Sequence, residues 1–564
     1  MKTVAKIVHE AVAGTRVDDG VRARLAEKLG GAALANSLEQ GPDGSLYIAA
    51  DVETGPVLLK IGSEASKVEA IPFAPTDRAN IERFVREVAP GFLPRPQGEL
   101  PAIATGNRHP EVSLPAAFQA FAEILKEKGV NAASTVQLSA TREMTTDAAI
   151  AARDGSDPVA AGHTRVSIQH LYHAGLWAAI RAGYRAGYTA EADHVIISGK
   201  DARDLAESME RGKEAIHHAA GFTKFTTDTS QVFNLRADRR HPQALSDAEV
   251  RAAFDSEFSA EERRWLLAEF AKPCGRYTFG EDDIRRLAVK FGRSLKLNEE
   301  LFDAIRREKG GAAFDFEPSL DEADTLTTPE ELIFNARWLA WRGRPAQLLP
   351  PNLGFKKRQA YPETFADLEQ YAHGKMWPEL LPRVAGEFGG KPLDELKARI
   401  AELASVALEF STTLSVHSGS GKQPAVLHSI REATHGRVNY KISGELQLQL
   451  FDVLSEQPAG SEWRGVFDRM VAGCEGFAAR HAFGKESELA AGYRERRGSY
   501  LGDAHGGRAD GNLFLVFWLG NMVGCRDEDG CFFKEKLDRL PGELVSEVRA
   551  RNTRYIKWLA EHLL

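Results

Sequence analysis

The sequence has 564 residues, of which 43% are hydrophobic, and a formal net charge of -8. This length exceeds one minimal domain and accommodates either a large α/β barrel with additions or several smaller modules. The acidic balance and the lack of a basic stripe argue against a nucleic-acid-binding protein and against attachment to an anionic membrane surface, because such proteins carry a basic excess.

The first part of the chain, residues 1–95, predicts a small α+β segment. A helical stretch is followed by a hairpin over residues 45–62, with a Thr-Gly-Pro turn, and by a second helix around residues 81–88. We expect this segment to pack against the outside of a larger body.

From residue 96 to residue 460 the pattern changes to short β-rich runs that end in polar residues and are separated by long helical stretches. Eight such runs begin at Pro101, Ser134, Gly187, Lys224, Phe314, Gln347, Thr412 and Val438. Eight strands that alternate with helices predict a (β/α)8 TIM barrel, whose active site forms at the carboxyl ends of the strands. A helical run at Phe314 or Thr412 would contradict this fold.

Residues 461–564 predict a C-terminal helical extension packed on the barrel, because apolar residues recur there at helical spacing. The apolar stretch 512–524 is too short to span a bilayer. The four cysteines form no CxxC pair, which is typical of a reduced protein. Together these features predict a cytoplasmic protein without a membrane span.

Two histidines stand at the ends of predicted strands. His194 follows Asp193 directly, and His417 ends the seventh run. Neighbouring side chains of a strand point to opposite faces, so Asp193 and His194 can serve one site only where the strand ends. Either histidine alone is more often a hydrogen-bonded structural residue than a ligand. Both together, with Asp193 and Glu317 nearby, favour a divalent metal such as Zn, Mn, Co or Ni.

The segment HSGSGKQ after the seventh run is not a phosphate-binding P-loop. Val416 and Gln423 occupy the positions where that motif needs glycine and a hydroxyl residue. We expect Ser418 and Ser420 to form a loop at the mouth of the barrel and Lys422 to reach the ligand. The alternative is that Lys422 caps the following helix in solvent.

Two more cations lie near strand ends. Arg142 and Lys441 suit an anionic or polyhydroxylated ligand through charge-assisted hydrogen bonds. A solvated surface charge is the alternative for each of them.

The strand-end motifs, taken in order, resemble those of the tagaturonate epimerase family. The motifs are STVQLSATREM, YTAEADH, GFTKFTTDTS, FEPSLDEADTLTTPEEL, LSVHSGSGK and GRVNYKISG, and they extend over residues 100–450. The resemblance implies a metal-dependent interconversion of D-tagaturonate and D-fructuronate. It further implies that Asp193 accepts a proton, that Glu317 donates one, and that His194 and His417 bind the metal.

The chain departs from the family pattern at several positions, two of which lie in the strand-end motifs. Gly421 stands where the family has an aspartate, and Asn439 stands where it has a histidine. An asparagine carbonyl can bind a hard cation, so Asn439 is the expected third ligand, although it replaces imidazole poorly at zinc. The departures suggest a divergent member that acts on a sugar acid or a related ketose.

The reaction implied by the resemblance restricts the mechanism. The inverted carbon of tagaturonate is β to the ketone, so enolisation does not reach it, and either retro-aldol cleavage or transient oxidation is needed. No GxGxxG stretch follows a strand, so a nicotinamide cofactor is unsupported. We expect retro-aldol chemistry assisted by a metal.

Two alternatives stay open. A carbohydrate-binding or catalytically impaired barrel fits the changes at Gly421 and Asn439, and an empty mouth, or one filled by Phe and Trp residues of the segment 512–519, would favour it. An aldolase on the same scaffold fits a retro-aldol site that releases its fragments. The sequence does not predict the oligomeric state.

Overall fold

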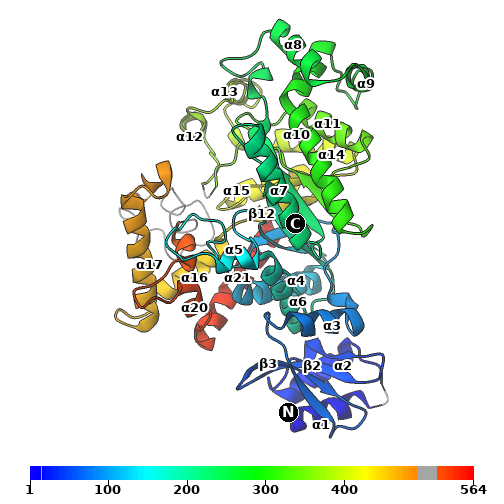
Figure 1. Cartoon of the computed structure of the whole chain (residues 1–564), viewed down its shortest axis with the longest axis vertical. Helices are drawn as coiled ribbons and strands as arrows, with labels where there is room; N and C mark the ends of the chain where they lie inside the picture. The colour runs from blue at the N-terminus through cyan, green and yellow to red at the C-terminus, as the bar shows by residue number, and fades with distance from the viewer. Residues whose placement is uncertain (14, 131, 358, 489, 492–517) are drawn as a thin grey trace.

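The computed structural model of the chain describes residues 1–13, 15–130, 132–357, 359–488, 490–491 and 518–564. Figure 1 shows a central barrel with the N-terminal segment at one end, further helices at the other end, and the C-terminal helices along one side. The eight-stranded sheet and its helices form one α/β body, as the sequence predicts.

The N-terminal segment has a four-stranded antiparallel sheet and three helices, and the first two helices share a separate apolar core with the sheet. The predicted hairpin is present as β2 and β3, which pair from Leu46 with Ile61 to Val52 with Gly55. The elements are α1 (Lys2–Val12), α2 (Asp19–Leu29), β1 (Glu39–Gln40), β2 (Leu46–Val52), β3 (Gly55–Ile61), β4 (Val68–Pro72) and α3 (Arg78–Glu87).

All eight predicted runs contain a strand, and these strands pair in parallel in the order β10-β11-β12-β5-β6-β7-β8-β9. Neither the run at Phe314 nor the run at Thr412 is helical, so the barrel prediction is confirmed. The strands are β5 (Ala102–Gly106), β6 (Ala133–Ser139), β7 (Tyr188–Ile196), β8 (Lys224–Asp228), β9 (Asp315–Pro318), β10 (Leu348–Leu349), β11 (Thr413–Val416) and β12 (Val438–Ile442).

The barrel is nearly closed between β9 and β10, the two ends of the strand order. The Gln347 backbone N–H donates to the Phe316 carbonyl at 2.9 Å, and the Phe316 N–H donates to the Gln347 side chain at 2.8 Å. Further along, the Leu320 N–H donates to the Pro350 carbonyl at 3.2 Å. These bonds join the two edge strands where a regular ladder is too short to do so.

Most helices of this region cover the outside of the barrel, and the rest extend from one end of it (Figure 1). They are α4 (Pro110–Lys128), α5 (Asp147–Ala151), α6 (Ile168–Ala182), α7 (Ala202–His218), α8 (Asp247–Glu257), α9 (Ala260–Phe270), α10 (Glu281–Glu308), α11 (Pro329–Trp341), α12 (Phe365–Ala372), α13 (Leu380–Gly386), α14 (Pro392–Glu409), α15 (Pro424–Thr434) and α16 (Glu445–Ser455). Helices and sheet share one large apolar core.

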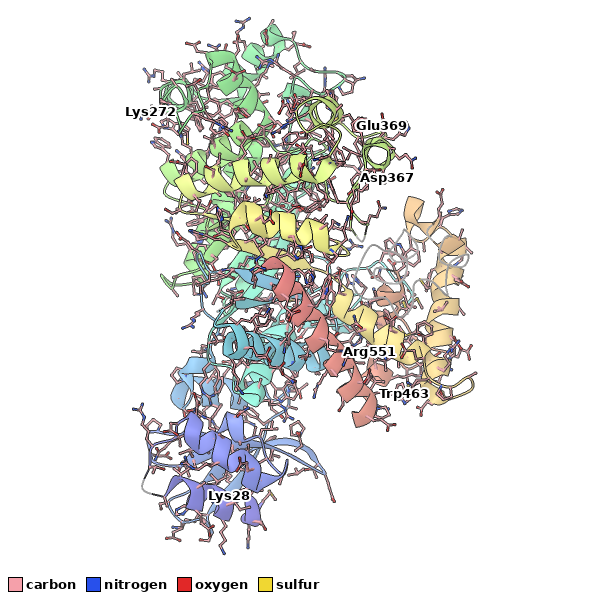
Figure 2. The ribbon with its side chains drawn as sticks, turned by 180° about the vertical axis from the view of Figure 1, so that it is seen from behind. Lys28, Lys272, Asp367, Glu369, Trp463 and Arg551 are labelled. Atoms are coloured by element: carbon pink, nitrogen blue, oxygen red, sulfur yellow. The ribbon has the colours of Figure 1, made fainter. Side chains whose placement is uncertain are left out.

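The C-terminal part adds α17 (Glu462–Ala479), the short α20 (Phe533–Leu537) and α21 (Gly542–Leu563). Helix α21 lies along the outside of the barrel against α4 and α15, as Figure 2 shows from behind. Arg551 on α21 donates to Glu456 at the end of α16, at 2.6 and 2.9 Å. In the described part of the chain, no helix is both long enough and apolar enough to cross a membrane.

Candidate metal centre and active site

A polar cavity of about 180 Å³ opens at the carboxyl ends of the barrel strands. Its walls come from the ends of β5, β6, β7, β8, β11 and β12 and from the loops that follow β9 and β10. The lining residues are Gly106, Arg108, Gln137, Leu138, Ser139, Arg142, Glu143, Asp193, His194, Ile196, Asp228, Asp321, Glu322, Lys357, His417, Ser418, Lys441, Ser443 and Gly444. A (β/α)8 barrel places its reactive residues at this end.

A β-bulge in β7 brings both Asp193 and His194 to the cavity. Ala192 pairs with Phe225 and Val195 with Thr227, so β7 carries one extra residue at this point. The extra residue is accommodated by a left-handed backbone at His194, where φ is 50°. A bulge redirects a side chain that regular alternation would turn away. The strand continues to Ile196, so the local reason is the bulge and not the strand end that the sequence suggested.

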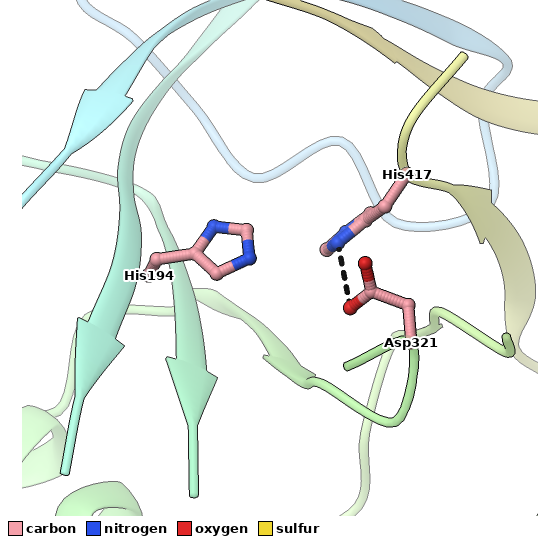
Figure 3. Close-up of side chains that lie close together, drawn as sticks. All are labelled: His194, Asp321 and His417. Atoms are coloured by element: carbon pink, nitrogen blue, oxygen red, sulfur yellow. Dashed lines mark ion pairs between the residues drawn. The ribbon is translucent and has the colours of Figure 1, made fainter. Parts of the chain in front are cut away.

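His194, His417 and Asp321 converge at the cavity (Figure 3). One potential ligand atom from each lies within 4.8 Å of the other two, and the two imidazole centroids are 5.2 Å apart. Asp321 comes from the loop after β9, where its carboxylate accepts a hydrogen bond from the Ser319 hydroxyl. Two imidazoles and one carboxylate are a common donor set for divalent transition metals.

Each imidazole is oriented by a buried carboxylate. Asp193 Oδ1 lies 2.8 Å from His194 Nδ1, and Glu317 Oε1 lies 2.6 Å from His417 Nε2. A metal-binding histidine usually has its second ring nitrogen held in this way, which fixes the tautomer and the ring direction. The two carboxylates that the sequence assigns to proton transfer therefore also hold the two candidate ligands.

The local electrostatics suit a cation. Burial alone would lower the pKa of His194, but Asp193 outweighs burial and raises it to about 10. The pKa of His417 is also raised, because Asp321 and Glu317 together oppose its burial. His417 Nδ1 is buried and lies 3.0 Å from Asp321 Oδ1 without a well-directed hydrogen bond. A cation shared by these two atoms would satisfy both, so the residues fit a divalent metal.

A network of buried charges lies beneath the cavity. Lys441 Nζ is within 2.7 Å of carboxylate oxygens of Glu191, Asp193 and Glu317. Lys224, which is fully buried, lies 2.9 Å from Glu317 and 3.2 Å from Glu191. This alternation of two cations and three anions lets charged groups remain ionised inside the barrel, because each has an opposite partner.

The network sets the charge of the two predicted proton-transfer residues. Burial would raise the pKa of Asp193 and of Glu317. His194 and Lys441 outweigh burial at Asp193, and Lys224 and Lys441 outweigh it at Glu317, so both pKa values are well below the usual range. Asp193 lines the cavity, whereas Glu317 is fully buried and does not. An ionised, enclosed carboxylate is poorly placed to donate a proton, so the geometry gives Glu317 a holding role.

Asn439 is not brought into the metal cluster. It faces the barrel interior one layer below, where its amide donates to Ser415 Oγ at 2.7 Å. The pairing of Val416 with Tyr440 places Ser415 and Asn439 two residues before His417 and Lys441, which is roughly 6.6 Å further down the strands. The third group at the cluster is Asp321. This residue lies in a loop, where the alternation of inward and outward residues in a strand does not apply, so no pattern in the sequence pointed to it.

The loop after β11 differs in part from the prediction. Ser418 lines the cavity with φ of 55°. Ser420 is buried and joins two loops: it accepts from the Ser443 N–H and donates to Glu445, both at 3.0 Å. Gly421 has φ of 74°, a conformation that favours glycine over the aspartate of the family pattern.

Lys422 neither reaches the cavity nor caps a helix in solvent. It is 2% exposed, and its Nζ donates to the carbonyls of Lys356, Gln359 and Ser420 at 2.8, 2.9 and 3.2 Å. Three carbonyl acceptors at fixed positions thus bind the ammonium group. Lys422 thereby ties down the loop that carries Lys357 to the cavity wall.

We expect Lys422→Met to loosen this loop. The change leaves buried carbonyls unsatisfied and should lower the free energy of unfolding by about 1–3 kcal/mol. Hydrogen exchange should become faster in peptides that contain Lys356 and Gln359. Lys375→Met, which replaces an exposed lysine nearby, should leave both quantities unchanged. Unaltered exchange in the Lys422 variant would show that the loop does not depend on this side chain.

Sequence reasoning missed several residues of the site. Glu191 and Lys224 are inward residues, two positions before Asp193 and Thr226, so alternation along the two strands could have found them. Arg108 and Glu143 form a buried pair at 2.6 Å in the cavity wall. They lie in loops, where no periodic signal identifies inward residues. Lys441 and Arg142 line the cavity as expected.

The sequence offered the segment 512–519 as a possible filling of the barrel mouth, and only its last two residues, 518 and 519, are described. Residues 512–517 lie outside the described residues. Trp518 is buried and stacks on Phe483 with ring centroids 4.4 Å apart, in the core of the C-terminal helices, and it is not part of the cavity lining.

The fold and the site define a (β/α)8 barrel with a candidate metal centre at its mouth. A family model described as tagaturonate epimerase matches residues 161–358. A tagaturonate/fructuronate epimerase of Thermotoga maritima is 26% identical over 283 residues, which is 50% of this chain and 49% of that protein. The match thus spans about half of the curated relative. The resemblance to the tagaturonate epimerase family is confirmed by these findings.

Solved structures show the same fold. The native and the one-glycerol crystal structures of fructuronate-tagaturonate epimerase UxaE from Cohnella laeviribosi superpose with TM-scores of 0.65 and 0.66, at 18% identity. They cover 96% and 97% of this chain, and the superposition includes 99% of each of those chains. The barrel and its additions therefore form one known architecture.

Proposed function

We propose that the protein is an isomerase that epimerises a hexuronate of the tagaturonate and fructuronate type with the help of a divalent cation. The observation that carries the proposal is the convergence of His194, His417 and Asp321 beside the ionised Asp193 at the mouth of the barrel. The Cohnella laeviribosi epimerase shares this fold, and the Thermotoga maritima epimerase matches part of the sequence. The proposed substrate is small and polar, as is the cavity.

His194, His417 and Asp321 would hold the cation. When bound, a divalent cation polarises a carbonyl oxygen and stabilises the negative charge that develops on it. Asp193 and Glu317 contribute by keeping the two imidazoles in position, at 2.8 and 2.6 Å. Carboxylates that hold both imidazoles fix the direction of the ligand nitrogens, and electrostatic catalysis requires such fixed groups.

Asp193 is the proposed base. It lines the cavity, it is ionised, and it can accept the proton of the hydroxyl group on the carbon β to the ketone. Cleavage of the bond between the α and β carbons then gives an aldehyde and an enediolate fragment. After the aldehyde has turned, the bond re-forms on its other face, and Asp193 returns the proton to the new alkoxide. No net proton is gained or lost.

Lys441 would support both states of Asp193. Its Nζ is 2.7 Å from Asp193 Oδ1 and lines the cavity. A cation at this distance keeps the carboxylate ionised before the reaction and stabilises the return of its charge afterwards. The buried Glu317 takes no direct part in this scheme, and its role as proton donor stays a prediction of the resemblance.

Product analysis tests the function. Tagaturonate, fructuronate, other hexuronates and neutral ketohexoses, each incubated with the protein and a divalent cation, should be followed by ¹³C NMR. We expect interconversion of tagaturonate and fructuronate. Accumulation of three-carbon fragments would instead identify an aldolase, and ligand binding without any new product would identify a binding protein. Either result would contradict the proposed epimerisation.

A further inference from the structure

We propose that Arg142 binds the carboxylate of the sugar acid and makes the site select acids over neutral sugars. The inference rests on the proposed function, because it names the group that recognises one end of the substrate. Nothing else described so far explains how the site would distinguish a hexuronate from a ketohexose of the same size.

The charges around the cavity single out Arg142. Arg108 is paired with Glu143 at 2.6 Å, and Lys441 is surrounded by three carboxylates. Lys357 lies 4.0 Å from Glu322. Arg142 also lines the cavity, yet within the described ranges no carboxylate is close enough to form an ion pair with its guanidinium group. It is thus the cavity cation whose charge is left for a ligand.

The backbone of Arg142 is fixed relative to the metal cluster. The Thr141 hydroxyl donates to the His194 carbonyl at 3.1 Å and accepts from the Ile196 N–H at 3.3 Å, so it spans the β7 bulge. The Arg142 carbonyl accepts from the Gly162 N–H at 2.8 Å. These bonds join the loop after β6 to the backbone of β7 at the bulge and so fix the Arg142 backbone relative to His194, in the wall of the same cavity.

The side chain itself has the chemistry for this task. A guanidinium group presents parallel N–H donors that match the two oxygens of a carboxylate, and such paired bonds are stronger than neutral hydrogen bonds. Two acids of the wall, Asp193 and Asp321, lie against the imidazoles of the metal cluster, at 2.8 and 3.0 Å. A substrate carboxylate would be repelled there and attracted to the Arg142 side, which orients the sugar.

Anchoring the carboxylate also suits the proposed chemistry. In the retro-aldol cleavage of tagaturonate, the aldehyde fragment is the one that carries the carboxylate. A fragment held at one end can turn about its remaining carbon–carbon bond and react again without leaving the site. Arg142 would thereby favour epimerisation over fragment release.

A neighbouring cavity supplies a matched control. It lies between the loop after β6 and α7, and Arg211 on α7 lines it but not the polar cavity. Arg211 is exposed, as Arg142 is. Arg211→Gln removes the same charge at a comparable position and should not alter recognition at the metal cluster.

The test compares an inert acid with its neutral counterpart. Galactonate and galactitol share the six-carbon chain and differ in the carboxylate, and their dissociation constants can be measured by calorimetry. The full-length protein is measured with an added divalent cation and again after chelation. The comparison separates binding of the carboxylate to the cation from its binding to Arg142. We expect the unaltered protein to prefer galactonate by about ten- to a hundredfold in both states.

Arg142→Gln should abolish this preference and leave the affinity for galactitol unchanged, whereas Arg142→Lys should retain part of it. Arg211→Gln should behave as the unaltered protein. An Arg142→Gln variant that still prefers the acid would overturn the proposal, as would loss of the preference in Lys357→Gln alone. If the protein selects the acid through Arg142 but NMR shows no epimerisation, the carboxylate site stands and the proposed function fails.

Discussion

His417→Ala should lower kcat for epimerisation by more than about a hundredfold and remove the bound cation. Replacing a residue that merely supports a metal ligand already costs roughly ten- to a hundredfold in affinity or activity. His417 contributes a nitrogen to the cluster itself and is the partner of both Glu317 and Asp321. The measurements are metal content by mass spectrometry and initial rates by NMR.

The matched control is His428→Ala. His428 lies on α15 outside the barrel, where it stacks on His562. This variant should retain full metal content and activity. If His417→Ala keeps a stoichiometric cation and normal kcat, the assignment of His417 as a ligand is wrong, and the 2.6 Å contact with Glu317 is only structural.

Lys441→Met should destabilise the protein by about 3–5 kcal/mol at neutral pH, as expected when one partner of a buried charge network is removed. The change leaves Glu191, Asp193 and Glu317 close together, with Lys224 as the remaining lysine beside Glu191 and Glu317. The free energy of unfolding of this variant, measured in urea, is compared with that of Lys422→Met. Lys422 is equally buried but bonds neutral carbonyls, so its loss should cost less.

The loss in Lys441→Met should shrink as the pH falls. In the unaltered protein the pKa values of Asp193 and Glu317 are held low, so their contribution to stability is present above their unfolded pKa and is lost on acidification. Without Lys441 these folded-state pKa values rise, and protonation relieves the repulsion. Adding Glu317→Gln should restore part of the stability. If the loss of unfolding free energy in Lys441→Met does not change with pH, and adding Glu317→Gln restores none of it, the proposed charge network is wrong.

The barrel could be predicted because its strands are short, β-rich and separated by long helices. The runs at Phe314 and Thr412 carry the signal even though β9 and β11 have only four residues each. Closure of the barrel depends instead on Gln347, whose bonds to Phe316 replace a regular ladder. Such an irregular contact has no sequence signature.

Site residues at the ends of strands could be predicted from the sequence. Site residues that a loop or a bulge brings to the cavity could not. His417 and Lys441 follow from strand ends. Asp321 joins the cluster through a loop, and His194 turns toward it because of the bulge in β7. Lys422 looked like a ligand-binding lysine from its neighbours in sequence, but burial among carbonyls of a distant loop decides its role.

Restoring activity to stripped protein tests the central claim most directly. The protein is treated with a chelator, dialysed and incubated with tagaturonate while Mn²⁺, Co²⁺, Ni²⁺ or Zn²⁺ is titrated back, and fructuronate is followed by NMR. We expect no turnover in the stripped protein and recovery that saturates at one cation per chain for at least one metal. Full epimerase activity in stripped protein with no detectable cation would contradict it.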